Sequence, residues 1–376
     1  MSHERDNEEP EPAAYGPPAR GVGRGRGQRV RSHRRALKIG GWVTLGVVAL
    51  GGAGLAALWS QLDGNIQGTD INTALGQDRP DKRDNGAMNI LLLGSDSRAG
   101  THGKYGSGVS GARSDTAMVL HIDKSHRKAD VVSVPRDTLV NRPACPKPGG
   151  GSAPAAQKSM FNASYQAGGP ACTVKTVEKM SGVRMDHYLE VDFKGFRTLI
   201  DELGGVDIQT ERAIADKDSQ LSLSAGHHTL RGEQALELVR TRHGVGDGSD
   251  LGRIQLQQSF IKALMHRVRS LGLTDNPAKL YDLADTATRS VSTDSELASA
   301  RELLDLADEL QGIKPGNMNM TTLPVTYDPQ HKQRVIPLTK DAQQVWEALR
   351  QDRAIPKSAT SKSAGDQSDS PVSSGA

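Results

Sequence analysis

Three pairs of a carboxylate and a guanidinium stand beside three short apolar runs in the first half of the chain. The pairs are Asp96 with Arg98, Arg113 with Asp115, and Arg136 with Asp137. Carboxylate oxygens suit Mg²⁺, and the planar fork of arginine donates hydrogen bonds to phosphate in pairs. If the three pairs meet, they form a site for a magnesium-complexed phosphate. Taken singly, each residue is equally typical of a surface ion pair or a turn.

The apolar runs beside these pairs predict strands. They cover residues 89–93, 117–122 and 130–134, and each has strand length and flanking breaker residues. The link at 123–128 is typical of a hairpin. In an antiparallel meander, the end of the first strand, the start of the second and the end of the third lie at one edge of the sheet. We therefore expect the three charged pairs at one rim.

A second basic cluster lies later in the chain. Arg240 and Arg242 follow a predicted helix, and Arg253 stands in the first turn of the next one. Asp250 is a plausible N-cap of that helix, and Gln257 lies one turn further along the same face as Arg253. A helix N-terminus with arginines nearby is suited to an anion, although a solvated basic face has the same pattern.

Further elements complete an α/β pattern. We expect helices near 175–180, at 193–203, 232–239 and 251–268, within 278–311, and at 340–351, and strands near 187–191, 206–209, 318–324 and 334–337. Mixed strands and helices over residues 88–356 indicate one α/β domain. Residues 60–87 are polar and predict a linker, and the Ser-, Ala-, Gly- and Asp-rich residues 357–376 predict a disordered tail.

The N-terminal part predicts a membrane anchor. Residues 39–59 carry no charge, would span about 30 Å as a helix, and have Trp42 and Trp59 near their ends. The arginine-rich residues 1–38 would lie in the cytoplasm by the positive-inside rule, and everything after Trp59 would lie outside the cell membrane. A cleaved signal peptide is the alternative, but the apolar run is longer than a usual h-region and no clean cleavage site follows.

The charge distribution argues against nucleic acid as a partner. The formal net charge is +3, of which residues 1–38 supply +4 and the remaining chain −1. The folded part therefore lacks the basic surface that binding to nucleic acid needs.

The two cysteines, Cys145 and Cys172, would lie in an oxidising compartment under this topology. A disulfide between them would stabilise the fold by about 3.5 kcal/mol in the loop-entropy model. Two free buried thiols are the alternative.

Eight ordered strings within residues 88–270 resemble the LytR-CpsA-Psr family. They are NILLLGSDSR, RSDTAMVLHID, VVSVPRDT, FNASYQAGG, TVEKMSGVRMDHYLEVDF, DELGGVDI, GEQALELVRTRH and DLGRIQLQQ. The resemblance implies a central mixed, largely antiparallel sheet sandwiched between helices, an apolar tunnel for a lipid, and an N-terminal transmembrane helix. It also implies a Mg²⁺-dependent phosphotransferase that moves a glycopolymer from a polyprenyl-pyrophosphate carrier to a muramic acid hydroxyl of peptidoglycan, forming a phosphodiester.

The resemblance assigns roles by position. Asp96 and Asp115 would hold Mg²⁺, and Asp96 is also the candidate general base. Gln257 would be a polar helper. The arginines that would bind the phosphates are Arg113, Arg136, Arg240, Arg242 and Arg253. Of these, Arg136 and Arg240 are expected to act in catalysis.

The chain departs from the family pattern at three places. The segment between Asp96 and Arg113 is longer and glycine-rich, Met160 stands where a lysine is common, and Leu256 stands where an arginine is common. Expected partners are the lipid-linked glycopolymer, peptidoglycan and membrane lipid. The alternatives are a module that binds polyprenyl phosphate or wall polymer without turnover, and a lipid pyrophosphatase.

Overall fold

The computed structural model divides into two compact units, Met1–Leu58 and Trp59–Ala376, and the second contains all the elements discussed below. The structure describes residues 57–83, 85–96, 114–243, 245, 248–272, 277–361, 363–364 and 370–375. The expected cytoplasmic arm and most of the expected transmembrane segment lie outside these residues, as do Arg98 and Arg113. Among the described residues, no helix has the length and apolar character needed to cross a membrane.

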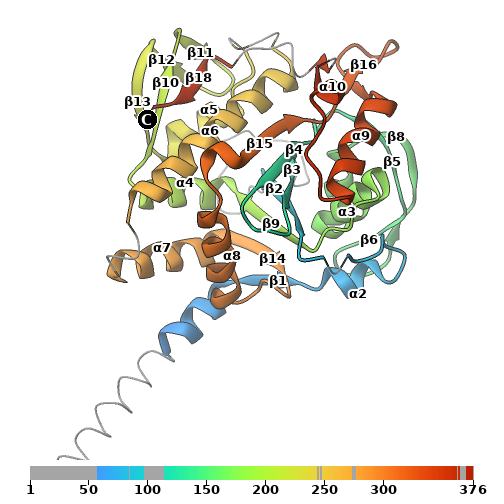
Figure 1. The fold of residues 1–376 in the computed structure, drawn as a ribbon, viewed down its shortest axis with the longest axis horizontal. Coiled ribbons are helices and arrows are strands. Elements are labelled where there is room, and N and C mark those ends of the chain that lie inside the picture. The colour runs from blue at the N-terminus through green and yellow to red at the C-terminus, as the bar shows by residue number, and fades with distance from the viewer. Residues whose placement is uncertain are drawn as a thin grey trace, which may run out of the picture. The chain divides into compact units, whose positions relative to one another are not determined.

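A seven-stranded mixed sheet lies at the centre of the second unit (Figure 1). Its order is β1 (Gln67–Thr69), β14 (Val291–Asp294), β9 (His187–Asp192), β2 (Met88–Ser95), β3 (Ser114–Ile122), β4 (Ala129–Ser133) and β15 (Met318–Thr322). The predicted β2–β3–β4 meander is confirmed, since both pairings are antiparallel. The expectation of a largely antiparallel sheet is only half right, because β1–β14, β9–β2 and β15–β4 are parallel. Long connections bring β9 and β15 alongside the meander, and such connections permit parallel pairing.

Helices and shorter strands surround this sheet. The helices are α2 (Ile71–Leu75), α3 (Ala163–Ser181), α4 (Phe193–Glu202), α5 (Gly232–Arg240), α6 (Asp250–Ser270), α7 (Pro277–Ser290), α8 (Ala300–Gly312), α9 (Thr339–Arg350) and α10 (Lys357–Thr360). The remaining strands are β5 (Leu139–Arg142), β6 (Cys145–Pro146), β7 (Ser152–Ala153), β8 (Ala156–Met160), β10 (Val206–Thr210), β11 (Ile214–Asp216), β12 (Leu221–Leu223), β13 (Gly226–Leu230), β16 (Val325–Tyr327), β17 (Val335–Pro337) and β18 (Val372–Ser374).

Both faces of the sheet are buried, which explains why its central strands are nearly continuous apolar runs. Leu91 and Val119 pack on one face with residues of α3 and α9. Their neighbours Ile90 and Leu120 point to the other face, where α6 and α8 contribute apolar side chains. The expected sandwich of a sheet between helices is therefore confirmed.

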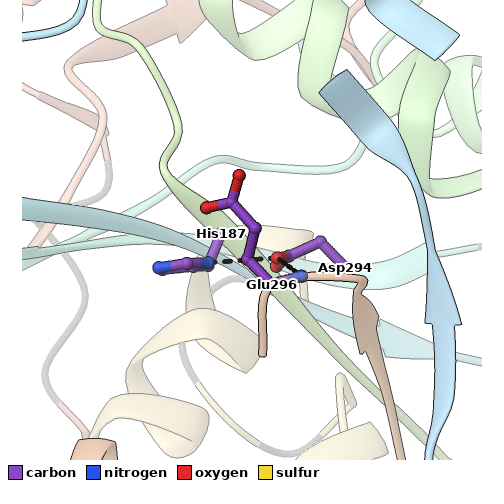
Figure 2. Close-up of side chains that lie close together, drawn as sticks. All are labelled: His187, Asp294 and Glu296. Atoms are coloured by element: carbon purple, nitrogen blue, oxygen red, sulfur yellow. Dashed lines mark hydrogen bonds and ion pairs between the residues drawn. The ribbon is translucent and has the colours of Figure 1, made fainter. Parts of the chain in front are cut away.

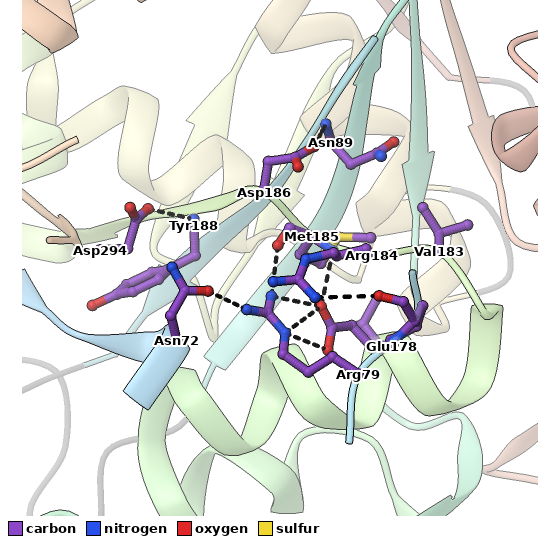
Figure 3. A network of polar contacts seen from close by, with 12 residues as sticks. Asn72, Arg79, Asn89, Glu178, Val183, Arg184, Met185, Asp186, Tyr188 and Asp294 are labelled. Atoms are coloured by element: carbon purple, nitrogen blue, oxygen red, sulfur yellow. Dashed lines mark hydrogen bonds and ion pairs between the residues drawn. The ribbon is translucent and has the colours of Figure 1, made fainter. Parts of the chain in front are cut away.

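The expectation that residues 60–87 form a linker is wrong. β1 pairs with β14 in the central sheet, and Ile71 and Leu75 of α2 are buried in the core. Arg79 forms a buried ion pair with Glu178 and also donates to the carbonyl oxygen of Met185 at 2.7 Å (Figure 3). Ile71, Leu75 and the ion-paired Arg79 therefore attach this polar segment to the domain. Such a small number of contacts cannot be recognised from the overall composition of the segment.

The expectation of a disordered tail is wrong for the described part of residues 357–376. α10 packs against α9, with Ala359 fully buried. β18 adds an antiparallel strand to β10, and Val372 of β18 is buried in a second apolar cluster with α5 and α6. Backbone hydrogen bonds to the edge of β10 need no particular side chains, so a composition poor in apolar residues does not reveal them.

Cys145 and Cys172 form the expected disulfide, which joins β6 to α3. The helix α3 is kinked at Gly168 and Gly169, before Pro170. A Cβ atom on Gly168 would lie 2.2 Å from the carbonyl oxygen of Pro146, so only glycine permits this close approach of helix and strand.

Replacing both cysteines by serine is expected to lower the free energy of unfolding by about 3.5 kcal/mol, because the bridge closes a loop between residues 27 positions apart. Denaturant unfolding of the double variant and of the oxidised and reduced parent protein measures this difference. Reduction should destabilise the parent as much as the substitutions do and leave the variant unchanged. Equal midpoints for the oxidised parent and the variant would contradict the prediction.

Candidate functional site

A β-bulge places the two candidate metal-binding carboxylates at the same end of neighbouring strands. Gly94 of β2 pairs with Thr116 and Ser95 pairs with Ser114, which leaves Asp115 as the extra residue of β3. A bulge redirects the side chain of its extra residue. Asp96 is buried and follows the last residue of β2 directly. The register therefore brings Asp96 and Asp115 to the rim where the meander predicts them.

Arg136 links this rim to the start of α6. Its guanidinium forms an ion pair with Asp115, and its Nε lies 3.6 Å from an oxygen of Asp137 and 3.8 Å from an oxygen of Asp250. The backbone N–H of Arg136 also donates to the carboxylate of Asp250 at 3.0 Å. Arg136, Asp137 and Asp115 thus meet as the sequence predicts.

Asp250 is not the N-cap of α6, which corrects the sequence interpretation. Ser249 is the N-cap, and its hydroxyl accepts from the N–H of Leu251. Asp250 stands in the first turn, where its nearly buried carboxylate pairs with Arg253 and lies 3.7 Å from Arg242. The carboxylate of Asp250 therefore joins three segments: the loop after β4, the first turn of α6 and the segment after α5.

Arg253 and Gln257 reach the strands from α6, as their shared helix face predicts. The Nη2 of Arg253 donates to the backbone carbonyl of Asp115 at 2.8 Å. The side-chain amide of Gln257 donates to the hydroxyl of Thr116 at 2.9 Å and to the carbonyl of Val239 at 3.0 Å. Gln257 consequently positions β3 against α5 and α6.

Arg240 and Arg242 complete the cluster. The guanidinium of Arg240 lies over the ring of Phe193, 4.9 Å from its centroid. The backbone N–H groups of Arg242 and His243 donate to buried Asp216 at 2.8 and 2.9 Å, so Asp216 fixes the path of this segment. The four described arginines Arg136, Arg240, Arg242 and Arg253 line one polar cavity of about 210 Å³ together with Asp115.

Four arginines and three carboxylates, Asp115, Asp216 and Asp218, line the cavity, so positive charge exceeds negative charge by one. Burial opposes ionisation of Asp115, but the guanidiniums of Arg253 and Arg136 outweigh it and hold the pKa of Asp115 below its ordinary value. Burial, with repulsion from Arg253 and Arg136, lowers the pKa of Arg242. Both shifts mean that an added anion would relieve repulsion between the arginines.

Buried donors in the cluster lack hydrogen-bond acceptors. The Nε atoms of Arg136 and Arg253 have no hydrogen-bond partner among the described residues. An unsatisfied buried donor costs free energy, and a bound ligand with acceptor oxygens would remove that cost. These two open donors suit an anion with oxygen acceptors, such as a phosphate, although the Oδ1 of Asp250 in the same cluster likewise has no hydrogen-bond partner among the described residues.

An apolar cavity of about 370 Å³ adjoins the arginine cluster. It lies between the sheet and helices α4, α5 and α6, and its walls include Phe196, Leu236 and Leu264. Asp115, Arg240, Arg253 and Gln257 line its polar end. A ligand that fits both cavities has an anionic group joined to an apolar chain.

Comparison with known proteins decides the family. The family model described as the LytR_cpsA_psr family matches residues 58–351. The chain belongs to the LytR_cpsA_psr family. The matched region begins ahead of the expected linker, which agrees with the placement of β1 and α2 in the folded unit.

Relatives in the family carry cell-wall names. The chain is 32% identical over 311 residues to the cell wall biosynthesis protein LcpA of Corynebacterium glutamicum, a match that covers 76% of this chain and 59% of LcpA. It is 30% identical to the polyisoprenyl-teichoic acid–peptidoglycan teichoic acid transferase TagT of Bacillus subtilis, covering 77% of this chain and 88% of TagT. A structure of TagT bound to LI-WTA matches with a TM-score of 0.54 and 25% identity, covering 73% and 96% of the two chains. The chain thus spans less than two thirds of the length of LcpA.

The donor set fits Mg²⁺, the metal that the LytR_cpsA_psr resemblance implies. Asp115 is held ionised, and only one of its two carboxylate oxygens is engaged by Arg136. Asp96 supplies a second carboxylate at the same rim. Hard oxygen ligands of this kind, completed by water and phosphate oxygens, are what Mg²⁺ prefers.

Another carboxylate and histidine cluster has a structural role. His187, Asp294 and Glu296 place their ligand atoms within 4.8 Å of one another (Figure 2). The carboxylate of Asp294 already accepts from His187 at 3.1 Å and from the N–H groups of Tyr188 and Glu296, and Glu296 accepts from Asn72. These contacts hold β14 against β9, and they leave no reason to add a metal ion.

Sequence reasoning missed the positioning residues of the site. The bulge at Asp115 and the hydrogen bonds that Asp216 accepts depend on contacts between segments that are not neighbours in the sequence. Asp216 stands in an unremarkable polar stretch, and no sequence signal singles it out. Arg113 lies outside the described residues, so its expected place on the phosphate stays a prediction.

Proposed function

We propose that this protein is a phosphotransferase that moves a glycopolymer from a polyprenyl-pyrophosphate carrier to a hydroxyl of peptidoglycan. The observation that carries the proposal is the arginine cluster, with its unsatisfied buried donors, at the mouth of an apolar cavity. A lipid pyrophosphate has the matching parts, an anionic head and an apolar chain. The name of TagT, a polyisoprenyl-teichoic acid–peptidoglycan teichoic acid transferase, supports a lipid-linked donor, and the name of LcpA supports a role in cell wall biosynthesis.

In the proposed reaction, the acceptor hydroxyl oxygen forms a bond to the phosphorus that carries the polymer. The bond from that phosphorus to the bridging oxygen breaks, and the lipid monophosphate leaves. Arg136, Arg240, Arg242 and Arg253 neutralise the phosphate oxygens and orient the diphosphate, so that catalysis is mainly positioning and electrostatic stabilisation. Asp96 and Asp115 would hold Mg²⁺, which supplies further neutralisation of the diphosphate charge.

The membrane topology belongs to the same proposal. Residues 39–59 would anchor the chain, residues 1–38 would lie in the cytoplasm, and the folded unit would lie on the outer side of the membrane. The disulfide between Cys145 and Cys172 supports this placement, because disulfides persist in oxidising compartments.

The decisive test is an assay with the full chain in detergent, a lipid-pyrophosphate-linked oligosaccharide, peptidoglycan oligomers and Mg²⁺. We expect mass analysis to detect a new phosphodiester and free lipid monophosphate. Release of lipid monophosphate and phosphorylated glycan without a transfer product would favour the pyrophosphatase alternative. Binding of the donor without any product would favour a binding module.

Filling the apolar cavity is expected to weaken binding of the lipid part selectively. Leu264 is half-buried in the cavity wall, so Leu264→Trp should be accommodated by the fold. Loss of about 60 Å² of apolar contact raises the KM for a long-chain donor about tenfold. Leu264→Met is the matched control, and a short-chain donor should show no change in KM. An equal rise for both donors would contradict lipid binding in this cavity.

A further inference from the structure

A larger polar groove lies beyond the arginine cluster. It has a volume of about 660 Å³ and is lined by Arg136, Asp137 and Arg242, and by the connection between β16 and β17. We call it the outer groove. Arg136 and Arg242 also line the central polar cavity, so the groove opens directly onto the arginine cluster.

The outer groove and the apolar cavity lie at opposite ends of the cluster. Along α6, Asp250 and Leu251 line the groove, Arg253 lines the central and apolar cavities, and Phe260 and Leu264 line the apolar cavity alone. The 14 positions from Asp250 to Leu264 correspond to about 21 Å of helix. In phosphoryl transfer the attacking and leaving oxygens are roughly in line with phosphorus. With the leaving lipid phosphate on one side, the nucleophile must enter from the other.

The walls of the groove suit a sugar chain with acidic groups. Tyr327 is 37% exposed, one of three large hydrophobic side chains exposed among the described residues. Lys332 is exposed and Arg334 half-buried, and both belong to the connection between β16 and β17. A tyrosine offers an apolar face and a hydroxyl to a sugar ring, and the two cations suit carboxylates.

The β16–β17 hairpin is fixed to the catalytic rim. Thr138 and Val335 form a parallel bridge, and the N–H of Val335 donates to the carbonyl oxygen of Asp137. A ligand bound by Tyr327 and Arg334 would therefore have a fixed position relative to Asp137 and Arg136.

We propose that the outer groove binds the acceptor, a peptidoglycan glycan strand, with its reacting hydroxyl facing Asp137, which takes the hydroxyl proton. This inference rests on the proposed transfer function. The hydroxyl oxygen bonds to the polymer-bearing phosphorus, its proton passes to the Asp137 carboxylate, and the lipid monophosphate leaves with the electrons of the broken bond. Asp137 replaces Asp96 as candidate base, because metal binding and proton acceptance compete in one carboxylate.

The environment of Asp137 agrees with a proton acceptor. Burial and the neighbouring carboxylate of Asp250 raise the pKa of Asp137 above its ordinary value, despite the guanidinium of Arg136. Its side chain is 22% exposed at the boundary between the groove and the cluster. A raised pKa makes a carboxylate a better proton acceptor.

The first test measures acceptor and donor constants separately with a peptide-bearing peptidoglycan oligosaccharide as the acceptor. Tyr327→Ala and Arg334→Gln are expected to raise the KM for this acceptor about tenfold each and to leave the donor KM unchanged. Lys340→Gln is the matched control, because Lys340 is an exposed cation lining a separate cavity of about 740 Å³ between α3 and α9. Unchanged acceptor KM in both groove variants would overturn the proposal.

The second test concerns the proton. Asp137→Asn is expected to lower kcat about 10²-fold while both KM values stay the same. A merely structural role for Asp137 would disturb Arg136 and raise the donor KM, and that outcome, or an unchanged kcat, would overturn the assignment.

The groove can also be tested if the parent protein gives no transfer product, in which case the proposed function has failed. Direct titration with the same oligosaccharide in the absence of donor then reports on the groove. Binding that Tyr327→Ala weakens and Lys340→Gln does not would support the groove, whereas equal binding by both variants would overturn it.

Discussion

Replacing Arg136 by alanine is expected to reduce the rate of glycopolymer transfer by about 10³-fold, an increase of about 4 kcal/mol in the activation free energy. Arg136 contacts Asp115, Asp137 and Asp250, and its Nε is one of the buried donors without an acceptor. The substitution removes both the guanidinium that we propose binds phosphate and the partner of three carboxylates. The assay that detects the phosphodiester product measures the rate.

The fold of the Arg136→Ala protein is expected to persist, because the side chain lies at the rim, outside the apolar clusters. Circular dichroism and the unfolding midpoint check this. Arg136→Lys keeps the charge without the planar fork and should give an intermediate rate. Arg301→Ala is the matched control, since Arg301 is 81% exposed on α8. A transfer rate equal to the parent's in folded Arg136→Ala protein would remove Arg136 from the site.

The second large effect is expected at the proposed Mg²⁺ site. Asp115→Asn should lower transfer about 10²-fold and abolish its dependence on Mg²⁺, because the neutral amide is a weaker ligand. The same change removes the negative charge that offsets Arg136 and Arg253, so donor binding in a chelator should be as tight as in the parent protein or tighter. Titration with the donor in chelator and in Mg²⁺ separates these two effects.

General damage to the protein would lower both transfer and binding in the chelator, and that result would contradict the charge argument. Asp305→Asn is the matched control, because Asp305 is 68% exposed on α8 and pairs weakly with Arg301. An Asp115→Asn protein that keeps its full response to Mg²⁺ would exclude Asp115 as a metal ligand.

Much of the site could be predicted from local patterns. The three apolar runs and their charged neighbours identified the meander and its rim, and the helix spacing of Arg253 and Gln257 placed both on the face that meets β3. The expectations that were wrong had been inferred from amino-acid composition alone. Residues 60–87 and 357–376 are polar, yet β1, α2 and β18 are integral to the fold.

The sequence by itself determined the residue types of the site, the two periodicities that produce its strands and helices, and membership of the LytR_cpsA_psr family. The tertiary structure alone decided that Asp115 occupies a bulge, that Asp250 and Asp216 hold the arginine-bearing segments, and that a polar groove and an apolar cavity flank the cluster. The physical reason is the distance along the sequence over which each kind of contact acts. Side-chain periodicity reports local backbone geometry, whereas register, positioning contacts and cavities arise from hydrogen bonds and packing between segments that are separated in the sequence, by 26 residues for Asp216 and Arg242 and by 141 for Thr116 and Gln257.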